Sequence, residues 1–306
     1  SVTGVQTCAL PISHFVAANV SHSIQAIDCV VNPITPEIMR LRPAWSKTFW
    51  ERKIGRDPLA GEGVTLEQLL ALMDDAGIER SLLVATKTGT LGTRGAWHLP
   101  YSIVADAVQR HPARFSGLAG LDATEGMAGV REFERAVREY GFVGAHFYPH
   151  WFELAPDHAR WYPFYAKCVE LDVPVQLQVG QSLVYDPGRP LRSVGRPITL
   201  DAVACDFPEL KLIGIHVGIP WTEEMIAMAW KHANVYIGCD AHSPKYWPQS
   251  FVQYINSYGQ DKVIFGTDYP VLDFARTRRE IDALGLREEP LRKLLRDNAR
   301  RLYKLP

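Results

Sequence analysis

The sequence lacks the short motifs that mark redox, metal or nucleotide chemistry. No CxxC pair and no metal-binding spacing joins its five cysteines, which stand at positions 8, 29, 168, 205 and 239. No GxGxxG turn and no P-loop follows an apolar run, so the sequence gives no support to a nucleotide-binding fold. Three of the four downstream cysteines lie in apolar or helical contexts typical of buried thiols, and a reducing cytoplasm is therefore the expected compartment.

An excess of one charge and a long hydrophobic run are also missing. The 306 residues carry a net charge of −1, so the charge balance does not indicate a nucleic acid or an anionic membrane as a partner. No apolar run is long enough to cross a bilayer. With 47% hydrophobic and 22% charged residues, the composition is that of an ordinary globular protein. The length allows one large barrel or two domains.

The first 13 residues, SVTGVQTCALPIS, differ in character from the rest of the chain. They have no hydrophobic period and no basic start, so they make a poor signal peptide. They closely resemble the translation of a sequencing-library adapter, an artefact of metagenomic assembly. We therefore expect residues 1–13 to be non-native, residues 14–306 to form the domain, and a few natural N-terminal residues to be missing.

Eight short apolar runs alternate with amphipathic segments along the chain. Strands are predicted at residues 24–31, 80–86, 114–121, 142–148, 173–179, 211–216, 234–238 and 262–268. Helices are predicted at residues 64–76, 101–111, 126–140, 160–171, 199–205, 222–232, 248–258, 275–284 and 289–303. This alternation predicts an α/β protein with a parallel sheet. Eight units in a chain of this length predict a closed (β/α)8 TIM barrel in a single domain.

Residues 34–63 form a long segment rich in Trp, Arg and Pro between the first strand and the first predicted helix. We expect it to be an irregular excursion over one end of the barrel. Its aromatic residues Trp45, Phe49 and Trp50 either form a lid or pack on the barrel, and packing is the favoured interpretation.

The stretch 262–270, KVIFGTDYP, holds the strongest single candidate for chemistry. Val263, Ile264 and Phe265 predict a buried strand, and Asp268 arrives where that strand ends. Pro270 then prevents the strand from continuing. A carboxylate is poorly placed there for packing and well placed for catalysis, because parallel barrels carry their active sites at this rim. The alternative is a carboxylate that only caps a turn or helix.

Polar side chains at or just after the predicted strand ends form the candidate site. They are Asp28, Asn32, Thr86, Lys87, Asp122, His146, Tyr148, His150, Gln178, Gln181, His216, Asp240, His242 and Asp268, with Trp151 beside them. Such a cluster suits metal binding or acid–base work. His146 could equally be a hydrogen-bonded core histidine, and His150 and His242 are expected on the surface. His216 is the stronger candidate, because Gly218 lets a ligand approach closely.

Four stretches resemble one known family. They are LIGIHVGIPWTEEMIAMAWKHANVYI, KVIFGTDYP, GFVGAHFYPHW and LRDNARRLYKL, and they are similar to the amidohydrolase-related family, in the branch of the aminocarboxymuconate-semialdehyde-type decarboxylases. The resemblance covers residues 24–305. It implies a TIM barrel, a hydrolase or non-oxidative decarboxylase of a small carboxylic acid, often aromatic or dicarboxylic, and one divalent metal, commonly zinc. A homo-oligomer, or an assembly with a paralogue, is expected on the same ground.

The resemblance carries only part of the family's metal site over to this chain. The sixth-strand histidine matches His216 and the eighth-strand aspartate matches Asp268. The two histidines of the first-strand HxH motif are replaced by Val30 and Asn32, and the fifth-strand histidine falls on Gln178 or Gln181. Neutral amides bind zinc weakly. We therefore expect either a metal-free site, or a relocated site in which His146, Asp240 or His242 joins His216 and Asp268.

Three functional hypotheses follow. In the first, the protein is a hydrolase or carboxy-lyase with Asp268 as general acid or base and His216 polarising the substrate. The substrate would be bound by Asn32, His146, Tyr148, Gln178, Gln181 and Trp151. The second is a metal-dependent enzyme with a rearranged site, and the third is a non-catalytic paralogue that serves as a binding or structural subunit. Arg189, Arg192 and Arg196 either pair with a substrate carboxylate or lie in a solvated loop.

Overall fold

The computed structural model describes residues 24–51, 63–93, 95–183, 185–186 and 189–306. The predicted adapter segment 1–13, with Cys8, lies outside the described residues, as do residues 52–62 of the Trp-rich excursion. Among the described cysteines, Cys29, Cys168 and Cys239 are buried free thiols and Cys205 is exposed. No helix in the described part of the chain has the length and apolar character needed to span a membrane.

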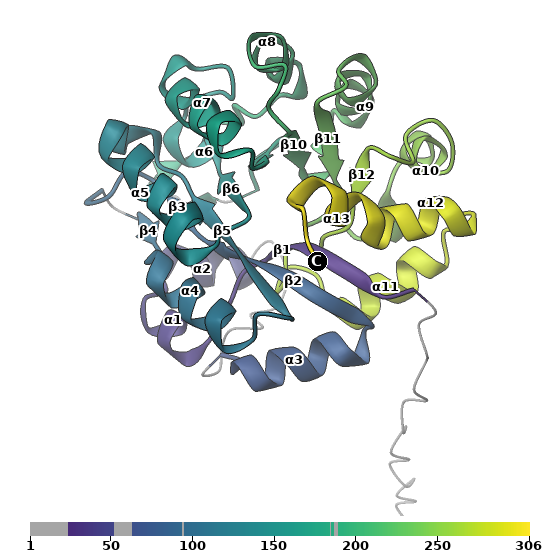
Figure 1. Cartoon of the computed structure of the whole chain (residues 1–306), viewed down its shortest axis with the longest axis horizontal. Helices are drawn as coiled ribbons and strands as arrows, with labels where there is room; N and C mark the ends of the chain where they lie inside the picture. Colours follow the sequence, from purple (N-terminus) through teal and green to yellow (C-terminus); the bar gives the residue numbers. More distant parts are fainter. Residues whose placement is uncertain (1–23, 52–62, 94, 184, 187–188) are drawn as a thin grey trace, which may run out of the picture.

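Eight parallel strands form the barrel that the sequence predicted (Figure 1). They are β1 (Ala26–Val31), β2 (Ile78–Ala85), β5 (Phe115–Gly120), β6 (Gly144–Phe147), β7 (Val175–Gln178), β10 (Leu212–Ile215), β11 (Val235–Gly238) and β12 (Val263–Ile264). They pair in this order. The barrel closes where the Cys29 amide donates to the Phe265 carbonyl at 3.0 Å and where Val31 bridges to Tyr269.

Helices surround the sheet and connect its strands (Figure 1). The outer helices are α3 (Leu66–Asp75), α4 (Tyr101–Arg110), α5 (Gly126–Tyr140), α7 (Tyr162–Leu171), α8 (Leu200–Asp206), α9 (Thr222–Lys231), α10 (Gln249–Ile255) and α11 (Phe274–Asp282). The chain ends in α12 (Glu288–Arg292), a π-helical turn (Lys293–Asp297) and α13 (Asn298–Tyr303). Local signals set the boundaries: Thr65 and Gln68 form a capping box at the start of α3, and Gly141 ends α5 in the left-handed conformation.

The structure corrects three details of the predicted elements. The eighth strand covers Val263–Ile264 rather than 262–268, because the chain turns away before it reaches Asp268. The excursion predicted as irregular contains two short helices, α1 (Pro36–Arg40) and α2 (Ala44–Phe49). Three further short elements stand at the strand ends: α6 (Pro149–Phe152), the hairpin of β3 (Lys87–Thr88) with β4 (Trp97–His98), and the hairpin of β8 (Tyr185–Asp186) with β9 (Arg189–Pro190).

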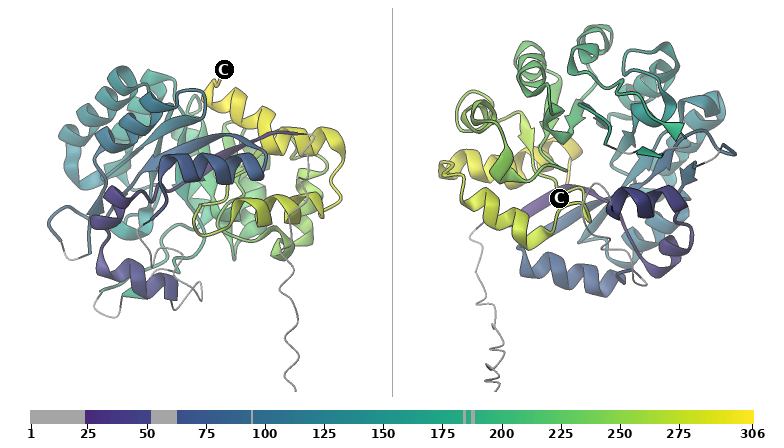
Figure 2. Two further views of the ribbon diagram at one scale, coloured as in Figure 1. Left: turned by 90° about the horizontal axis from the view of Figure 1, so that it is seen from below. Right: turned by 180° about the vertical axis from the view of Figure 1, so that it is seen from behind.

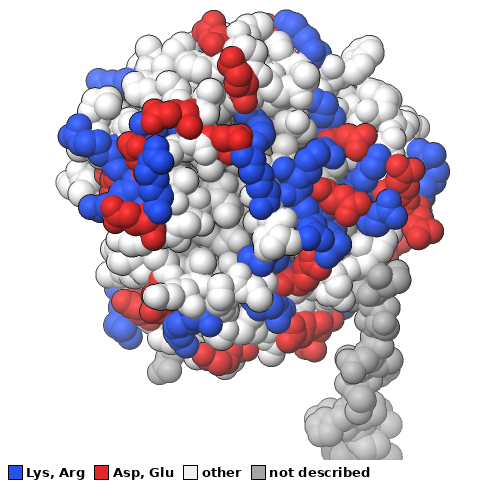
Figure 3. Space-filling model, in the orientation of Figure 1, with Lys and Arg blue, Asp and Glu red and all other residues white. Residues whose placement is uncertain are grey.

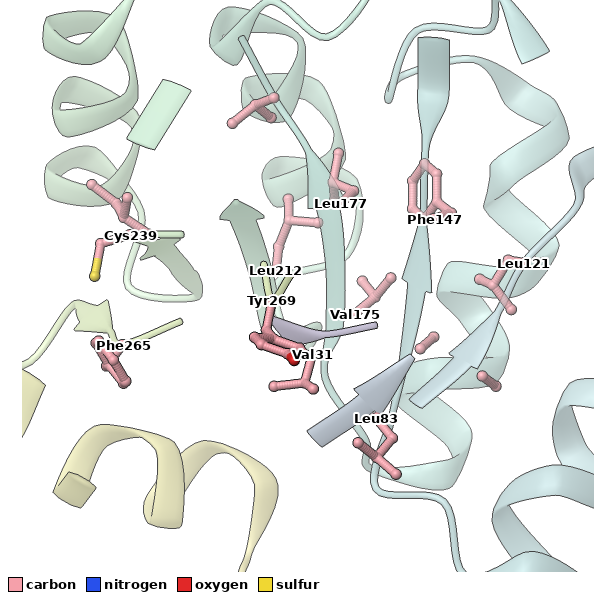
Figure 4. Close-up of a cluster of buried hydrophobic side chains, with 14 of the residues drawn as sticks. Val31, Leu83, Leu121, Phe147, Val175, Leu177, Leu212, Cys239, Phe265 and Tyr269 are labelled. Atoms are coloured by element: carbon pink, nitrogen blue, oxygen red, sulfur yellow. The ribbon is translucent and has the colours of Figure 1, made fainter. Parts of the chain in front are cut away.

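Two hydrophobic layers share the barrel strands by alternation. Leu83, Phe147 and Leu177 belong to the layer between the strands and the helices (Figure 4). Leu82 and Val84 belong to a second layer inside the barrel. Because side chains alternate along a strand, the neighbours of the outward residues on β6 and β7 point into the barrel, and these neighbours are polar.

The two ends of the barrel have different roles. The excursion helices α1 and α2 lie at one end and the C-terminal helix α13 at the other (Figure 2). Leu302, Tyr303 and Leu305 join the inner hydrophobic layer and close the barrel at the α13 end. Charges of both signs mix over the face seen in Figure 3. The polar residues at the C-terminal ends of the strands lie at the other end of the barrel, which carries α1 and α2.

Candidate active site

A cavity of about 190 Å³ opens at the C-terminal ends of the strands. Eight residues were predicted to act in catalysis or substrate binding. The cavity wall contains seven of them, which are Asn32, Tyr148, Trp151, Gln178, Gln181, His216 and Asp268. They come from or follow β1, β6, β7, β10 and β12, so the parallel sheet brings together residues up to 236 positions apart. This is the rim at which barrel enzymes place their chemistry.

Three side chains meet at the base of the cavity, and two of them, His216 and Asp268, line it. The Nε2 atom of His216 lies 3.2 Å from Oδ2 of Asp240 and 3.8 Å from Oδ2 of Asp268. The donor atoms of these three residues all lie within 4.8 Å of one another. Asp240 is fully buried, and neither its Oδ2 nor the Nε2 of His216 has a hydrogen-bond partner among the described residues. We call His216, Asp240 and Asp268 the floor triad.

Each member of the floor triad is held through its other polar atom. The His216 backbone amide donates to Oδ1 of Asp240 at 2.9 Å. The Asn32 side-chain amide donates to Oδ1 of Asp268 at 2.8 Å, and the Gln178 side-chain amide lies 3.1 Å from Nδ1 of His216. The outer atoms are therefore engaged, and the free Nε2 and Oδ2 atoms face a common point.

The backbone that carries the triad is strained. His216 and Val217 have φ angles of 70° and 58°, Ala241 has 64° and Asp268 has 55°. Residues other than glycine rarely adopt this left-handed region, and those that do concentrate at functional sites. The strain places Asp268 just past the end of β12 with its carboxylate towards the cavity.

The electrostatics of the triad couple its members. Burial acts to lower the pKa of His216, but the carboxylates of Asp240 and Asp268 outweigh it and the pKa is raised. Burial is also the main reason that the pKa of Asp268 rises to about 7, against the opposing charge of His216. A positive charge at the common point, whether a proton or a metal ion, is therefore stabilised by two carboxylates.

Aromatic side chains form the walls above the triad. The indole of Trp45 in α2 lies 4.5 Å from the ring of Trp151 and 6.4 Å from that of Trp97. Its Nε1 donates to the Gly95 carbonyl at 2.8 Å, which fixes the ring plane. Trp45 thus packs on the barrel and walls the cavity at once. Trp45 was predicted either to form a lid or to pack on the barrel, whereas Trp97 had no predicted role.

His146 does not reach the cavity, although it was predicted to bind the substrate. It is fully buried in β6, where Nδ1 lies 2.7 Å from the side-chain nitrogen of Gln176, whose oxygen accepts from Tyr303 Oη at 2.6 Å. Burial lowers the pKa of His146 to about 3. The His146 side chain points into the barrel but lies one layer of side chains below the cavity. This position agrees with the alternative of a hydrogen-bonded core histidine.

Of the two histidines predicted on the surface, His150 is buried and His242 is half-buried. His150 in α6 is fully buried and its Nδ1 accepts the Val194 amide at 3.0 Å. His242 lines the cavity beside His216, with 6.4 Å between ring centroids. Asp28 is corrected too, since it lies within β1 and not at its end. Arg192 and Arg196 are exposed and pair with Glu153 and Glu224, away from the cavity.

The burial of His150 predicts acid-sensitive stability. Burial lowers the pKa of His150 to about 4 from an ordinary 6.5. As the pH falls, His150 is therefore protonated in the unfolded chain before it is protonated in the folded protein. The stabilisation is therefore complete above pH 6.5 and is lost as the pH falls through 4. Each unit of pKa difference corresponds to about 1.4 kcal/mol.

Chemical denaturation at pH 7 and pH 4.5 tests this expectation with the His150→Asn variant, whose amide oxygen can still accept from Val194. We expect the wild type to lose about 2 kcal/mol more of its free energy of unfolding than the variant between these pH values. Equal losses in both proteins would contradict it.

The residues present fit a single divalent cation, although only His216 and Asp268 stand at positions that match the family's metal ligands. Val30 is buried in the inner core and the Asn32 amide already donates to Asp268. The floor triad instead offers one imidazole nitrogen and two carboxylate oxygens, the number of protein ligands that catalytic metal sites take. Hard carboxylate oxygens with one imidazole suit manganese, magnesium or zinc.

The sequence model of a protein family described as "Amidohydrolase" matches residues 14–305. A gamma-resorcylate decarboxylase of Polaromonas sp. (strain JS666) is 25% identical over 288 residues, which cover 78% of this chain and 87% of the relative.

Solved structures share the barrel. A TIM-barrel protein from Bordetella bronchiseptica is 24% identical with a TM-score of 0.75, covering 92% of this chain and 99% of its own. A 5-carboxyvanillate decarboxylase from Novosphingobium aromaticivorans, in complex with manganese and 4-hydroxy-3-methoxy-5-nitrobenzoic acid, is 20% identical with a TM-score of 0.69, covering 92% of this chain and 97% of its own.

Proposed function

We propose, from the premise that this chain belongs to the amidohydrolase family, that it is a non-oxidative decarboxylase of a hydroxybenzoate with a single carboxylate. The observation that carries the proposal is the floor triad, with its free donor atoms facing one point beneath an aromatic slot. The reaction agrees with the decarboxylases of aromatic acids among the relatives. The family is the one that the sequence stretches predicted.

The size and chemistry of the slot support a monocyclic aromatic substrate. Its volume of about 190 Å³ slightly exceeds the 150 Å³ of an engineered cavity that holds benzene. Trp45, Trp97, Trp151 and Tyr148 supply apolar and aromatic wall, and aromatic rings pack favourably on one another.

The absence of cationic wall residues argues against a diacid. Among the described residues that line the cavity there is no lysine or arginine. A carboxylate away from the floor would lose water without gaining an ionic partner, which is costly. Of the two acids named in the relatives, gamma-resorcylate has one carboxylate and 5-carboxyvanillate has two. We therefore assign the monoacid as the preferred class.

A cation, when bound, would be held by His216 Nε2 and Asp240 Oδ2, and by Asp268 Oδ2 whenever that oxygen carries no proton. It would supply Lewis-acid neutralisation of the substrate's carboxylate and adjacent hydroxyl oxygens. The chain's own residues set the orientation. Gln178 and Asn32 hold His216 and Asp268 by their outer atoms, and Tyr148, Gln181 and Trp151 contact the substrate from the wall.

Decarboxylation replaces a carboxylate by a proton at the ring carbon. Asp268 delivers this proton from Oδ2, the atom that Asn32 leaves free. A C–H bond forms at the ring carbon, then the C–C bond to the carboxylate breaks and its electron pair restores the aromatic ring. CO2 leaves, and Asp268 regains a proton from water. His216 polarises the carboxylate from the other side of the floor.

The test combines metal content with turnover, on protein purified without chelator and without a His-tag. We expect one divalent metal per chain and CO2 release from 2,6-dihydroxybenzoate. For 5-carboxyvanillate we expect kcat/KM to be lower by at least about 10-fold. A chelator should abolish turnover, and added Mn²⁺ should restore it.

Other outcomes separate the remaining hypotheses. Metal-loaded protein that releases no CO2 from either acid would refute the decarboxylase and favour a binding subunit. Turnover that survives metal removal would keep the decarboxylase and refute the cation. Faster turnover of the diacid would refute the substrate class.

A further inference from the structure

The chain buries a carboxylate that the proposed chemistry does not use. Asp28 lies within β1, is fully buried, and is surrounded by strand backbone. Its Oδ1 accepts the amides of Val30 and Thr267 at 3.1 Å and 3.0 Å. Its Oδ2 accepts the Thr267 hydroxyl at 2.6 Å. A buried carboxylate is costly unless its hydrogen bonds are made, and here two of the three bonds go to Thr267.

Thr267 in turn fixes the backbone of the turn that follows it. Its Oγ1 also accepts the Tyr269 amide at 3.0 Å. Asp268 stands between these two residues, with the left-handed φ of 55°. The backbone on both sides of Asp268 is therefore tied to one buried carboxylate from the neighbouring strand.

Asn32, which follows β1, also binds the turn that contains Asp268. The Asn32 amides, backbone and side chain, donate to the Tyr269 carbonyl at 2.8 Å and 3.1 Å. The Asn32 side chain also donates to Oδ1 of Asp268. Asp28 and Asn32 thus hold the turn at two levels, and only the Oδ2 of Asp268 is left for the cavity.

We infer that Asp28 is a positioning residue that, through Thr267, holds Asp268 in the strained conformation that aims its Oδ2 at the floor triad. The catalytic part of this inference rests on the proposed function, and the structural part does not. A residue tied only to fold stability would have no reason to bracket Asp268 from both sides. Losing a hydrogen-bonded support of a reacting or ligating group typically lowers activity by about 10–100-fold.

Three variants test the chain of contacts kinetically. Asp28→Asn keeps the acceptor for the two amides but cannot accept the Thr267 hydroxyl. Thr267→Val removes that hydroxyl, and Thr267→Ser restores it. We expect the first two to lower kcat by about 10-fold or more with little change in KM, and Thr267→Ser to retain wild-type kcat.

The Asp268→Asn background separates positioning from general stability. If Asp28 acts through Asp268, Asp28→Asn causes no further fall in the residual rate, because effects of residues that act as a unit are not additive. An equal fall in both backgrounds would overturn the inference, as would retained kcat in Asp28→Asn and Thr267→Val.

Amide hydrogen exchange provides a readout that needs no substrate. In Asp28→Asn we expect faster exchange at the amides of Thr267 and Tyr269, with the other strands unchanged. Uniformly faster exchange, or none, would overturn the inference. If no acid is turned over by the wild type, the proposed function fails while this measurement still decides whether Asp28 holds the turn.

Discussion

Replacing Asp268 by asparagine is expected to lower kcat for the hydroxybenzoate by about 10²–10⁴-fold, the usual contribution of a positioned acid or base. Asparagine has the same shape and its oxygen can still accept from the Asn32 side chain, so the turn should persist. Its amide cannot give a proton to a ring carbon. KM should change far less than kcat, because the aromatic walls are untouched.

A matched control for this variant is Asp122→Asn. Asp122 is, like Asp268, an aspartate after a barrel strand. It is fully buried, whereas Asp268 is partly exposed, and it is not among the residues that line the cavity. Its Oδ1 accepts from Thr124, a bond that asparagine can keep. Steady-state kinetics should show wild-type kcat for this control. If Asp268→Asn retained more than a tenth of the wild-type rate, Asp268 would not be the proton carrier.

Replacing Asp240 by asparagine is expected to weaken Mn²⁺ binding by at least about 10–100-fold and to remove turnover at low metal concentration. Asparagine keeps the oxygen that accepts the His216 backbone amide. It replaces the free Oδ2 by an NH2 group, which cannot ligate a cation. Electron paramagnetic resonance of free Mn²⁺ during a titration measures the change in affinity directly.

The same control variant also locates the metal. Asp122 belongs to another His, Asp and Glu group, with His98 and Glu125, so Asp122→Asn shows whether Mn²⁺ binds there. We expect its Mn²⁺ affinity to equal that of the wild type. Weaker binding in Asp122→Asn with unchanged binding in Asp240→Asn would place the cation at the other group and refute the floor triad as the metal site.

The barrel was predictable because its signal is local and repeated. Apolar runs bounded by turn residues recur eight times, and each predicted run overlaps an observed strand. The exact end of the eighth strand was not predictable, because the turn before Asp268 depends on a carboxylate from β1, more than 230 residues away. Local patterns carry no information about such a partner.

The sequence could predict which end of the barrel carries the candidate site. It could not predict which inward-facing residues reach the cavity. Seven predicted residues line the cavity, because strand ends in a parallel barrel must converge. His146 does not line the cavity, because a strand contributes several inward-facing side chains and only the last of them reaches the cavity. Asp240 was predicted as a polar strand-end residue and as one possible member of a relocated metal site, since no spacing motif links it to His216. The expected oligomer stays a prediction.

The reacting groups and the walls come from different parts of the chain. His216, Asp240 and Asp268 follow β10, β11 and β12, whereas Trp45, Trp97 and Trp151 stand in or beside short elements after β1, β2 and β6. Loops tolerate sequence change better than the strands they connect. In the evolution of such barrels, substitutions in the first half of the chain can therefore change which acid is the preferred substrate. The second half, which carries the floor triad, can keep the same reaction.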